Sequence, residues 1–261
     1  MFIMRSLFIV KNLAKLLLSL LVVSLMAVQL ASCSKKIPTN YAYRITFMEQ
    51  EQYVEPYPTR LIITPEFLRF DDGENAQDFI LFDRKNSVVH SVVSEEQTIM
   101  SVHKKSTTIE SPIKLELTDK DLGEMKDSPT IDGENPHHYQ LLVNGKVCND
   151  VIAVKGLLPA AVNALNEFSL VMASDSKMTL SSTPADMLNA CDLARDTFAP
   201  TRILKFGFPV QTLGKREYAR TLVDFDDKYK LDKKLFTLPE NYKRYTVQDL
   251  REGKVSFKEE G

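Results

Sequence analysis

The sequence predicts an α+β fold that is mostly β, in which a curled antiparallel sheet (a half-barrel) of about ten strands is covered by two helices. Three observations predict it. Apolar and polar residues alternate over much of 41–118, which is the period of a half-buried strand. An Asn-Gly hairpin signal follows at 144–145, and helical spacing is found over about 159–198. A sheet of this length must twist and curl, and two apolar helices can cover its concave face.

The first strand shows the alternation most clearly, because aromatic and aliphatic residues hold the odd positions from Tyr41 to Phe47. Polar clusters at 71–75, 83–86 and 94–96 separate the runs that follow, and their residues tolerate turn geometry. Further strands of this antiparallel meander are predicted at Arg60–Ile63, Phe67–Phe70, Phe79–Phe82, Val88–Val93, Thr98–Val102 and Ile113–Leu117.

The second half of the sheet is interrupted by loops and by the helices. A polar stretch over 119–136, which contains two prolines, predicts a loop. A hairpin is predicted next, with strands Tyr139–Val143 and Val147–Val154 joined by Asn144-Gly145. The last predicted strands are Arg202–Val210, Tyr218–Phe225 and Leu235–Leu238.

Two helices are predicted between the hairpin and the last strands. The first runs from about Pro159 to Ala173 and is apolar nearly all round, so we expect it to be covered on more than one side. The second begins at Thr183, an N-cap residue followed by proline at the first helical position, and ends near Phe198.

The N-terminus has the parts of a secretory signal. Residues 1–32 carry three cations and no acid, and an apolar run from Leu16 to Leu30 leads to Ala31-Ser32-Cys33. The sequence Leu-Ala-Ser-Cys resembles the end of bacterial lipoprotein signals. This resemblance implies that diacylglycerol is attached to the Cys33 thiol, that cleavage precedes Cys33, and that the new amine is acylated.

Three other interpretations of the N-terminus stay open: an ordinary cleaved signal, an uncleaved anchor helix and a buried core helix. The apolar run is shorter than the roughly 20 residues that span a bilayer. Ser34, rather than aspartate, follows Cys33, which resembles the outer-membrane sorting pattern of enteric bacteria. We therefore expect a protein of the cell envelope, anchored through its lipid in the outer membrane and facing the periplasm.

The predicted organisation follows from these signals. Residues 1–32 are the lipoprotein signal peptide, 33–40 the lipidated cysteine with a short tether, 41–247 a single half-barrel domain and 248–261 a charged tail. The tether reaches roughly 25 Å when it is fully extended, so the domain is expected to lie close to its membrane. The covalent lipid on Cys33 is the one non-protein group that we expect, and no other cofactor is predicted.

The two remaining cysteines, Cys148 and Cys191, are an even pair in an oxidising compartment, and we predict a disulfide between them. Cys148 follows the hairpin turn, and Cys191 lies in the second helical pattern, so the bond would join a strand to a helix. The alternative is two separate buried thiols, which behave as small apolar residues.

The order of elements also resembles a known family. The meander, the late helix pair, the returning strands and the closing segment Leu235–Tyr242 (Leu-Phe-Thr-Leu-Pro-Glu-Asn-Tyr) are similar to the lipoprotein-carrier (LolA/LolB-like) half-barrel. They resemble in particular uncharacterised proteobacterial lipoproteins that share it. The likeness covers about Tyr41 to Val247. It implies that acyl chains are held between sheet and helices, and it supplies no gating residue that can be matched to this chain.

The sequence carries no recognisable catalytic constellation. No serine-hydrolase, zinc-protease or phosphate-loop motif occurs, so we predict no enzyme, no catalytic residue and no metal site. We interpret His137-His138 as part of a solvated loop, and Glu49 with Glu51 as a solvated strand edge. The 33 Lys and Arg against 35 Asp and Glu, with no basic cluster in the body, argue against a nucleic-acid partner.

Two functions stay open at this point. One is a role in envelope interaction or assembly, through a protein partner and with the membrane held by the lipid anchor. The other is a carrier or binder of an apolar, lipid-like ligand in a cavity between sheet and helices. The residues expected to line that cavity are those aimed inward: Tyr43, Ile45, Phe47, Phe79, Leu81, Val162, Leu165, Phe168 and Met172.

Overall fold

The computed structural model describes residues 40–106, 108–180, 183–184, 187–215 and 218–255. The predicted signal peptide, Cys33 and most of the tether lie outside these residues. The described residues belong to one compact unit, Lys36–Gly261. This unit carries its own hydrophobic core, whose buried apolar residues run from Ala42 to Val210.

The described strands form a single open sheet of twelve strands, where the sequence predicted about ten. Its order is β12-β6-β5-β4-β3-β2-β1-β11-β10-β9-β8-β7, so β12 and β7 are the edges. All pairings are antiparallel except that of β12 with β6, which is parallel. The bounds are β1 Tyr41–Gln50, β2 Tyr57–Ile63, β3 Phe67–Asp71, β4 Phe79–Asp83, β5 Val88–Val93, β6 Thr98–His103, β7 Leu117–Glu124, β8 His137–Val143, β9 Lys146–Val154, β10 Phe208–Leu213, β11 Ala219–Lys230 and β12 Lys243–Thr246.

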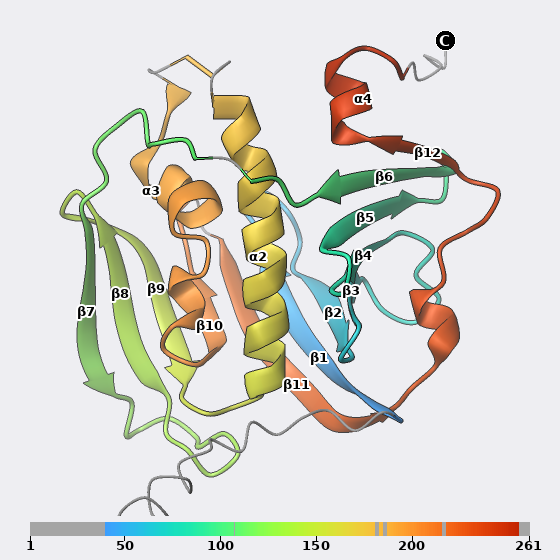
Figure 1. The fold of residues 1–261 in the computed structure, drawn as a ribbon. Helices are drawn as coiled ribbons and strands as arrows, with labels where there is room; N and C mark the ends of the chain where they lie inside the picture. Colours follow the sequence, from blue (N-terminus) through green and yellow to red (C-terminus); the bar gives the residue numbers. More distant parts are fainter. Residues whose placement is uncertain (1–39, 107, 181–182, 185–186, 216–217, 256–261) are drawn as a thin grey trace, which may run out of the picture. The chain divides into compact units, whose positions relative to one another are not determined.

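Two helical layers cover one face of this sheet, which we call the inner face (Figure 1). The long helix α2 (Pro159–Leu180) packs against β5, β6 and β10. The second layer is made of α3 (Ala190–Leu193), a π-helical turn η3 (Ala194–Phe198) and a 3-10 turn η4 (Arg202–Leu204). It lies over β8–β10, and η3 also packs against α2.

The main core lies between α2 and the inner face. Ala161 and Ala164 have no exposed surface there, and their small side chains let the helix approach the sheet closely. Phe168 fills the space beside them, because its ring packs 4.9 Å from Phe70 and 5.9 Å from Phe82. The buried members of the main core are Tyr43, Ile45, Phe47, Leu61, Ile63, Leu68, Phe82, Val89, Val102, Val154, Leu157, Leu158, Ala161, Ala164, Val171, Phe208 and Val210.

The outer face of β3 is covered by the chain that returns from β11 to β12 (Figure 1). This return segment contains the 3-10 turn η5 (Lys233–Phe236). The Phe236 ring stacks on Phe67 at 5.5 Å, and Arg69 donates a hydrogen bond from Nη1 to the Leu235 carbonyl at 2.8 Å. Part of the sheet is therefore buried on both faces.

This second covered face corrects the predicted positions of Phe79 and Leu81. Both were expected to face inward, but their neighbours Ile80 and Phe82 pack in or against the main core instead. The Phe79 ring lies on the outer face with its centroid 3.7 Å from the Arg69 guanidinium, and Leu81 is the register partner of Arg69. Both faces of β4 bury apolar side chains, so its residues Phe-Ile-Leu-Phe do not alternate between apolar and polar. The sequence therefore does not indicate which of them point toward the inner face.

Two predicted strands are wrong. The structure forms β7 over Leu117–Glu124, mostly in the stretch 119–136 that was predicted as a loop, and of the predicted strand Ile113–Leu117 only Leu117 belongs to it. The predicted strand Leu235–Leu238 is the turn η5 and the residues after it, and the last strand is β12. The predicted strand Arg202–Val210 is also shorter, because its first residues form η4 and β10 begins at Phe208.

Both predicted helices are present in part, but their bounds differ from the predicted ones. The first continues beyond the predicted Ala173 to Leu180. The second begins at Ala190 with Asn189 as its N-cap residue, rather than at Thr183. Asn189 Oδ1 accepts hydrogen bonds from two backbone N–H groups, which is the chemistry that an N-cap supplies. The first part of the predicted charged tail forms a short helix, α4 (Val247–Arg251).

Candidate functional site

A cleft of about 700 Å³ opens on the inner face between the two helical layers. Its volume lies within the range of small-molecule sites, about 300–1,000 Å³. The apolar residues that line it are buried or half-buried and come from the sheet and from both helical layers; we call this apolar lining the floor: Phe47, Leu165, Pro200, Ile203, Leu204 and Pro209. The charged residues that line it are half-buried or exposed and form its rim: Glu51, Arg195, Asp196, Lys215 and Arg220.

Each wall of the cleft comes from a different helical layer. On α2, Leu165 and Ser169 lie four residues apart, so one face of the helix carries both toward the cleft. The opposite wall begins with Arg195 and Asp196 on η3 and continues through η4. π-helical turns are rare and are found frequently at functional sites.

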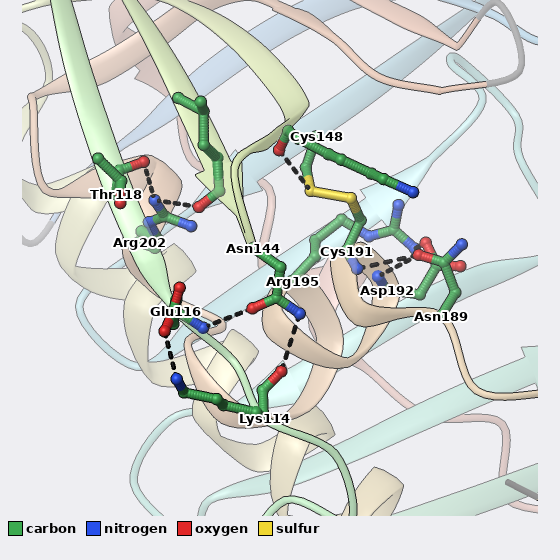
Figure 2. Close-up of a disulfide and its surroundings, with 12 residues drawn as sticks. Lys114, Glu116, Thr118, Asn144, Cys148, Asn189, Cys191, Asp192, Arg195 and Arg202 are labelled. Carbon is green, nitrogen blue, oxygen red and sulfur yellow. Dashed lines mark hydrogen bonds and ion pairs between the residues drawn. A yellow bond between two sulfur atoms is a disulfide. The ribbon is translucent and has the colours of Figure 1, made fainter.

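The second wall is fixed to the sheet by the predicted disulfide, which the structure confirms. Cys148 on β9 is bonded to Cys191 on α3 (Figure 2). Both are buried and pack with Val143 and Ala194 in a small core of their own. Arg195 follows Cys191 by one helical turn, so the bond holds the start of the wall against β9.

A polar row crosses the inner face at the cleft. Tyr57 on β2 is the register partner of Glu49 on β1, which is in turn the partner of Arg220 on β11. Arg220 is the partner of Thr212 on β10. Four neighbouring strands thus each contribute one polar side chain to a single row across the inner face, next to the buried ring of Phe47.

The centre of this row is the carboxylate of Glu49, whose side chain is only 5% exposed. It accepts three hydrogen bonds: from Arg220 Nε at 2.5 Å, from Thr59 Oγ1 at 2.9 Å and from the Tyr218 hydroxyl at 3.0 Å. Together they engage both oxygens. A buried carboxylate needs such partners, because an unsatisfied one loses its hydration without compensation.

The predicted assignment of Glu49 to a solvated edge is therefore wrong. Glu49 continues the odd positions Tyr43, Ile45 and Phe47 and so points inward. The same alternation that predicted the strand also indicates that Glu49 points inward. The prediction placed it in solvent because a charged residue near the end of a strand is usually exposed. Glu51 lies beyond β1, where it accepts a hydrogen bond of 2.5 Å from the Tyr57 hydroxyl.

Arg220 is held from two sides and still reaches the cleft. Its Nε is bonded to Glu49, and its guanidinium lies 4.8 Å from the centroid of the Phe47 ring. The side chain is 29% exposed and lines the cleft. Within the described part of the chain, no acceptor is hydrogen-bonded to its two Nη atoms.

Two tyrosine hydroxyls at this row are held in their protonated form. Burial, reinforced by the nearby charge of Glu49 and the hydrogen bond to it, raises the pKa of Tyr218 to about 12. The hydrogen bond to Glu51 is the main cause that raises the pKa of Tyr57 to about 12. Both tyrosines therefore act as hydrogen-bond donors to carboxylates at neutral pH.

The residues predicted to line a cavity lie mostly in the core. Tyr43, Ile45 and Phe47 are buried in it. Val162, Leu165, Phe168 and Met172 are partly buried and pack against it. Of the predicted set, only Phe47 and Leu165 line the cleft, and Val162 lines a second cavity of about 420 Å³ near the start of α2. The predicted space between sheet and helices is largely filled by these side chains.

The histidines of the predicted loop lie on a strand. His137 and His138 are the first residues of β8, and His138 Nε2 lies 2.8 Å from Asp150 Oδ1 on β9. In the described residues, no group of three or more His, Cys, Asp or Glu side chains is placed to hold a metal ion. None of the helices in that part of the chain has both the length and the apolar composition to cross a bilayer.

Comparison with solved structures gives distant likenesses. No protein-family model and no curated protein matches the sequence. An uncharacterised conserved protein of Thermus thermophilus superimposes with a TM-score of 0.41 and 10% identity, over 79% of this chain and 91% of its own. PNGF-II gives a TM-score of 0.39 with 12% identity over 81% of this chain and 32% of its own. MucB gives 0.37 with 6% identity over 79% of this chain and 60% of its own. These scores carry no conclusion about function, so the resemblance to lipoprotein carriers stays a prediction.

The disulfide generates the first testable prediction. Replacing both cysteines, as in Cys148→Ser with Cys191→Ser, should lower the free energy of unfolding by about 2–4 kcal/mol, because a long loop of the unfolded chain is no longer closed. Urea unfolding measures this loss. Hydrogen exchange should accelerate at the amides of η3 and η4, while those of β4 and β5 serve as the internal control. A fall in stability without a local change in η3 would contradict the role given to the bond.

A second prediction concerns alkaline pH. Tyr218 ionises at about 12 in the folded protein and at the ordinary value of 10.0 when exposed, so the unfolded chain loses its proton first. The free energy of unfolding should fall as the pH rises from about 10 toward about 12, and Tyr218→Phe should make that fall shallower. Urea unfolding at about pH 9 and about pH 11 measures the difference. Tyr53→Phe, at a side chain that is 95% exposed, is the matched control and should leave the slope unchanged.

Proposed function

We propose that this protein is a lipid-anchored binding protein of the bacterial cell envelope that holds an amphiphilic ligand in the cleft. The observation that carries the proposal is the cleft itself, with an apolar floor and a charged rim on an inner face that is otherwise largely packed. An apolar floor favours an alkyl or ring system, and a charged rim favours a polar group at one end. A deep cavity for whole acyl chains is not needed.

The location rests on the N-terminal sequence. The signal-like segment ending in Ala-Ser-Cys supports a lipid on Cys33, and Ser34 supports outer-membrane sorting toward the periplasm. The Cys148–Cys191 disulfide agrees with an oxidising compartment, where such bonds form and persist. The membrane is then a partner through the anchor, and no nucleic-acid partner belongs to the proposal.

We favour binding over catalysis because the carboxylate at the centre of the polar row is already hydrogen-bonded within the protein. The Glu49 carboxylate is engaged by three donors, which suits a fixed structural charge better than an acid or base that exchanges a proton with a substrate. The Tyr57 hydroxyl is likewise bonded to Glu51. We therefore propose no enzymatic activity and no cofactor beyond the covalent lipid.

A second candidate is the envelope interaction or assembly role that the sequence also predicted. The observation that favours it is the edge strand β7, which pairs with β8 on one side and is largely exposed. Such an edge offers backbone N–H and C=O groups to an added strand. Its Leu122 is 51% exposed, which adds an apolar contact for a protein partner.

The anchor is tested directly in cells. Cys33→Ala should abolish acylation and processing, because the thiol that receives the diacylglycerol is gone. Mass analysis of the wild-type protein should show an acylated cysteine as its first residue. A wild-type protein that begins at another residue, or that carries an unmodified Cys33, would remove the lipid anchor from the proposal.

The cleft is tested by filling it. Ser169→Trp places a large ring from α2 into the cleft, whereas Leu170→Trp places the same ring at a neighbouring position that is 45% exposed and does not line the cleft. Native mass spectrometry of gently purified protein should show a small amphiphile bound to the wild type and to Leu170→Trp. Ser169→Trp should lose it.

The controls separate the two candidate functions. Both tryptophan variants are first compared with the wild type by circular dichroism and urea unfolding, so that a folding defect is not mistaken for a filled cleft. Equal retention of the amphiphile by all three proteins would place its site elsewhere. Absence of a bound molecule from all three would favour the protein partner at β7.

A further inference from the structure

We infer that Arg220 recognises a carboxylate or phosphate group on the ligand, and that Glu49 is the positioning residue that aims it. The inference deepens the proposed function, since it names the chemistry of the ligand's polar end in the same cleft. It rests on three features of the described residues: how Arg220 is held, which of its N–H groups are left without an acceptor, and how the charges around it balance.

Arg220 is oriented before any ligand arrives. Its Nε donates to Glu49 at 2.5 Å and its guanidinium stacks against Phe47, which together fix the plane of the group. Glu49 is itself fixed by the Thr59 and Tyr218 hydroxyls. A side chain whose rotamers are already restricted loses less entropy on binding than a mobile surface arginine.

The two Nη atoms form the edge of the guanidinium that can bind the oxygens of an anionic group. Nε is occupied, while the Nη atoms have no acceptor within the described residues, and the side chain lines the cleft. Two N–H groups in one plane match the two oxygens of a carboxylate or phosphate, which a lysine cannot reproduce. Arg195, the other arginine of the rim, is instead engaged at Nε and Nη2 by Asp196.

The net charge of the site does not explain such recognition, which leaves geometry as its basis. Three cations line the cleft, and they are outnumbered by the acidic groups that line it or pair with its arginines: Arg195, Lys215 and Arg220 against Glu49, Glu51, Asp192 and Asp196. An anion is therefore not drawn in by a net positive field. Selection must come from the fork of Arg220 together with the apolar floor that receives the rest of the molecule.

The floor lies next to this fork. Phe47, against which Arg220 stacks, also lines the cleft, and Leu165 from α2 and Ile203 from η4 line the same space. A ligand with an oxyanion at one end can thus place its alkyl part on these residues while its head meets Arg220. The ligand class is an anionic amphiphile of about the size of a small-molecule ligand.

The test uses the disulfide-bonded chain from Lys36 onward, which is one compact unit with its own core. The probes are decanoate, decyl phosphate and decanol, below their aggregation concentrations and measured by calorimetry. The carboxylate and phosphate probes distinguish the two possible heads, and decanol reports on the floor alone. We expect the wild type to bind at least one of the anionic probes about tenfold more tightly than decanol.

Two substitutions isolate the fork. Arg220→Lys keeps a cation beside Glu49 but removes the paired N–H groups, and Arg220→Gln removes the charge. Both should lower the affinity for the preferred anionic probe about tenfold and leave that for decanol unchanged, which also shows that the cleft is intact. Arg44→Gln is the matched control, because Arg44 is similarly exposed at 34% and pairs with Asp224 on the same two strands, away from the cleft.

The outcomes separate this inference from the function on which it rests. Two results would show that Arg220 does not recognise the anionic group: equal affinity for decanol and the anions, or an affinity of Arg220→Lys for the preferred anion equal to that of the wild type. Neither result would contradict binding in the cleft itself. If none of the three probes binds, or if Ser169→Trp leaves their binding intact, the proposed function fails and the role of Arg220 fails with it.

Discussion

The structure depends on the packing of α2 against the inner face of one long sheet. Twelve strands in an open sheet accumulate twist and cannot stay flat, so the sheet curves and presents a concave side. A helix of 22 residues, about 33 Å long, fits along that side. Ala161 and Ala164 allow close contact, and larger side chains such as Phe168 fill what the alanines leave.

One helix cannot cover twelve strands, so the inner face is covered by two separate helical layers. The cleft lies between them. The strands toward β8 are covered by α3, η3 and η4, which are short and held by a disulfide rather than by a long helical contact. The two layers meet at η3 but leave space between Leu165 and Ile203. The cleft is therefore a consequence of covering a curved sheet with two separate pieces, and its size is set by how the second piece is fixed.

Buried ion clusters occur on both faces near β1–β3, and they serve different ends. On the outer face, Asp71 accepts hydrogen bonds from Arg60 and Arg69, and Arg69 also bonds the return segment at Leu235. Arg60 donates its remaining hydrogen bond to the Gly73 carbonyl, so both arginines of this cluster are bonded within the protein. On the inner face of the described sheet, only Nε of Arg220 donates a hydrogen bond to Glu49 from that guanidinium. The Nη atoms stay available to bind a ligand, so this cluster can contribute to a binding site as well as to the structure.

Much of the sheet could be predicted because strand signals are local. Period-two alternation and turn residues located most strands, and Asn144-Gly145 located the hairpin. The inward set Tyr43, Ile45 and Phe47 followed from the same alternation. The signal peptide and Cys33 lie outside the described residues, so that part of the prediction stays a prediction.

What could not be predicted depends on contacts between distant segments. Phe79 and Leu81 were placed on the wrong face because the return segment, more than 140 positions later in the sequence, covers the outer side of the sheet. Glu49 was placed in solvent because its partner Arg220 is 171 positions away. The short parallel strand β12 has no signal of its own, since its place is set by pairing with β6.

The disulfide links the shape of the cleft to the redox state of its surroundings. Cys148 and Cys191 join only where the surroundings are oxidising, and the signal-like N-terminus is what would deliver the chain there. The bond fixes α3, and with it the π-helical turn that carries Arg195 and Asp196 to the rim. A chain kept in a reducing compartment would retain α2, the main core and the Glu49–Arg220 pair, because none of these involves sulfur. It would lack only the disulfide that holds the second wall. The geometry of the cleft therefore depends on the redox state of the compartment through this single bond.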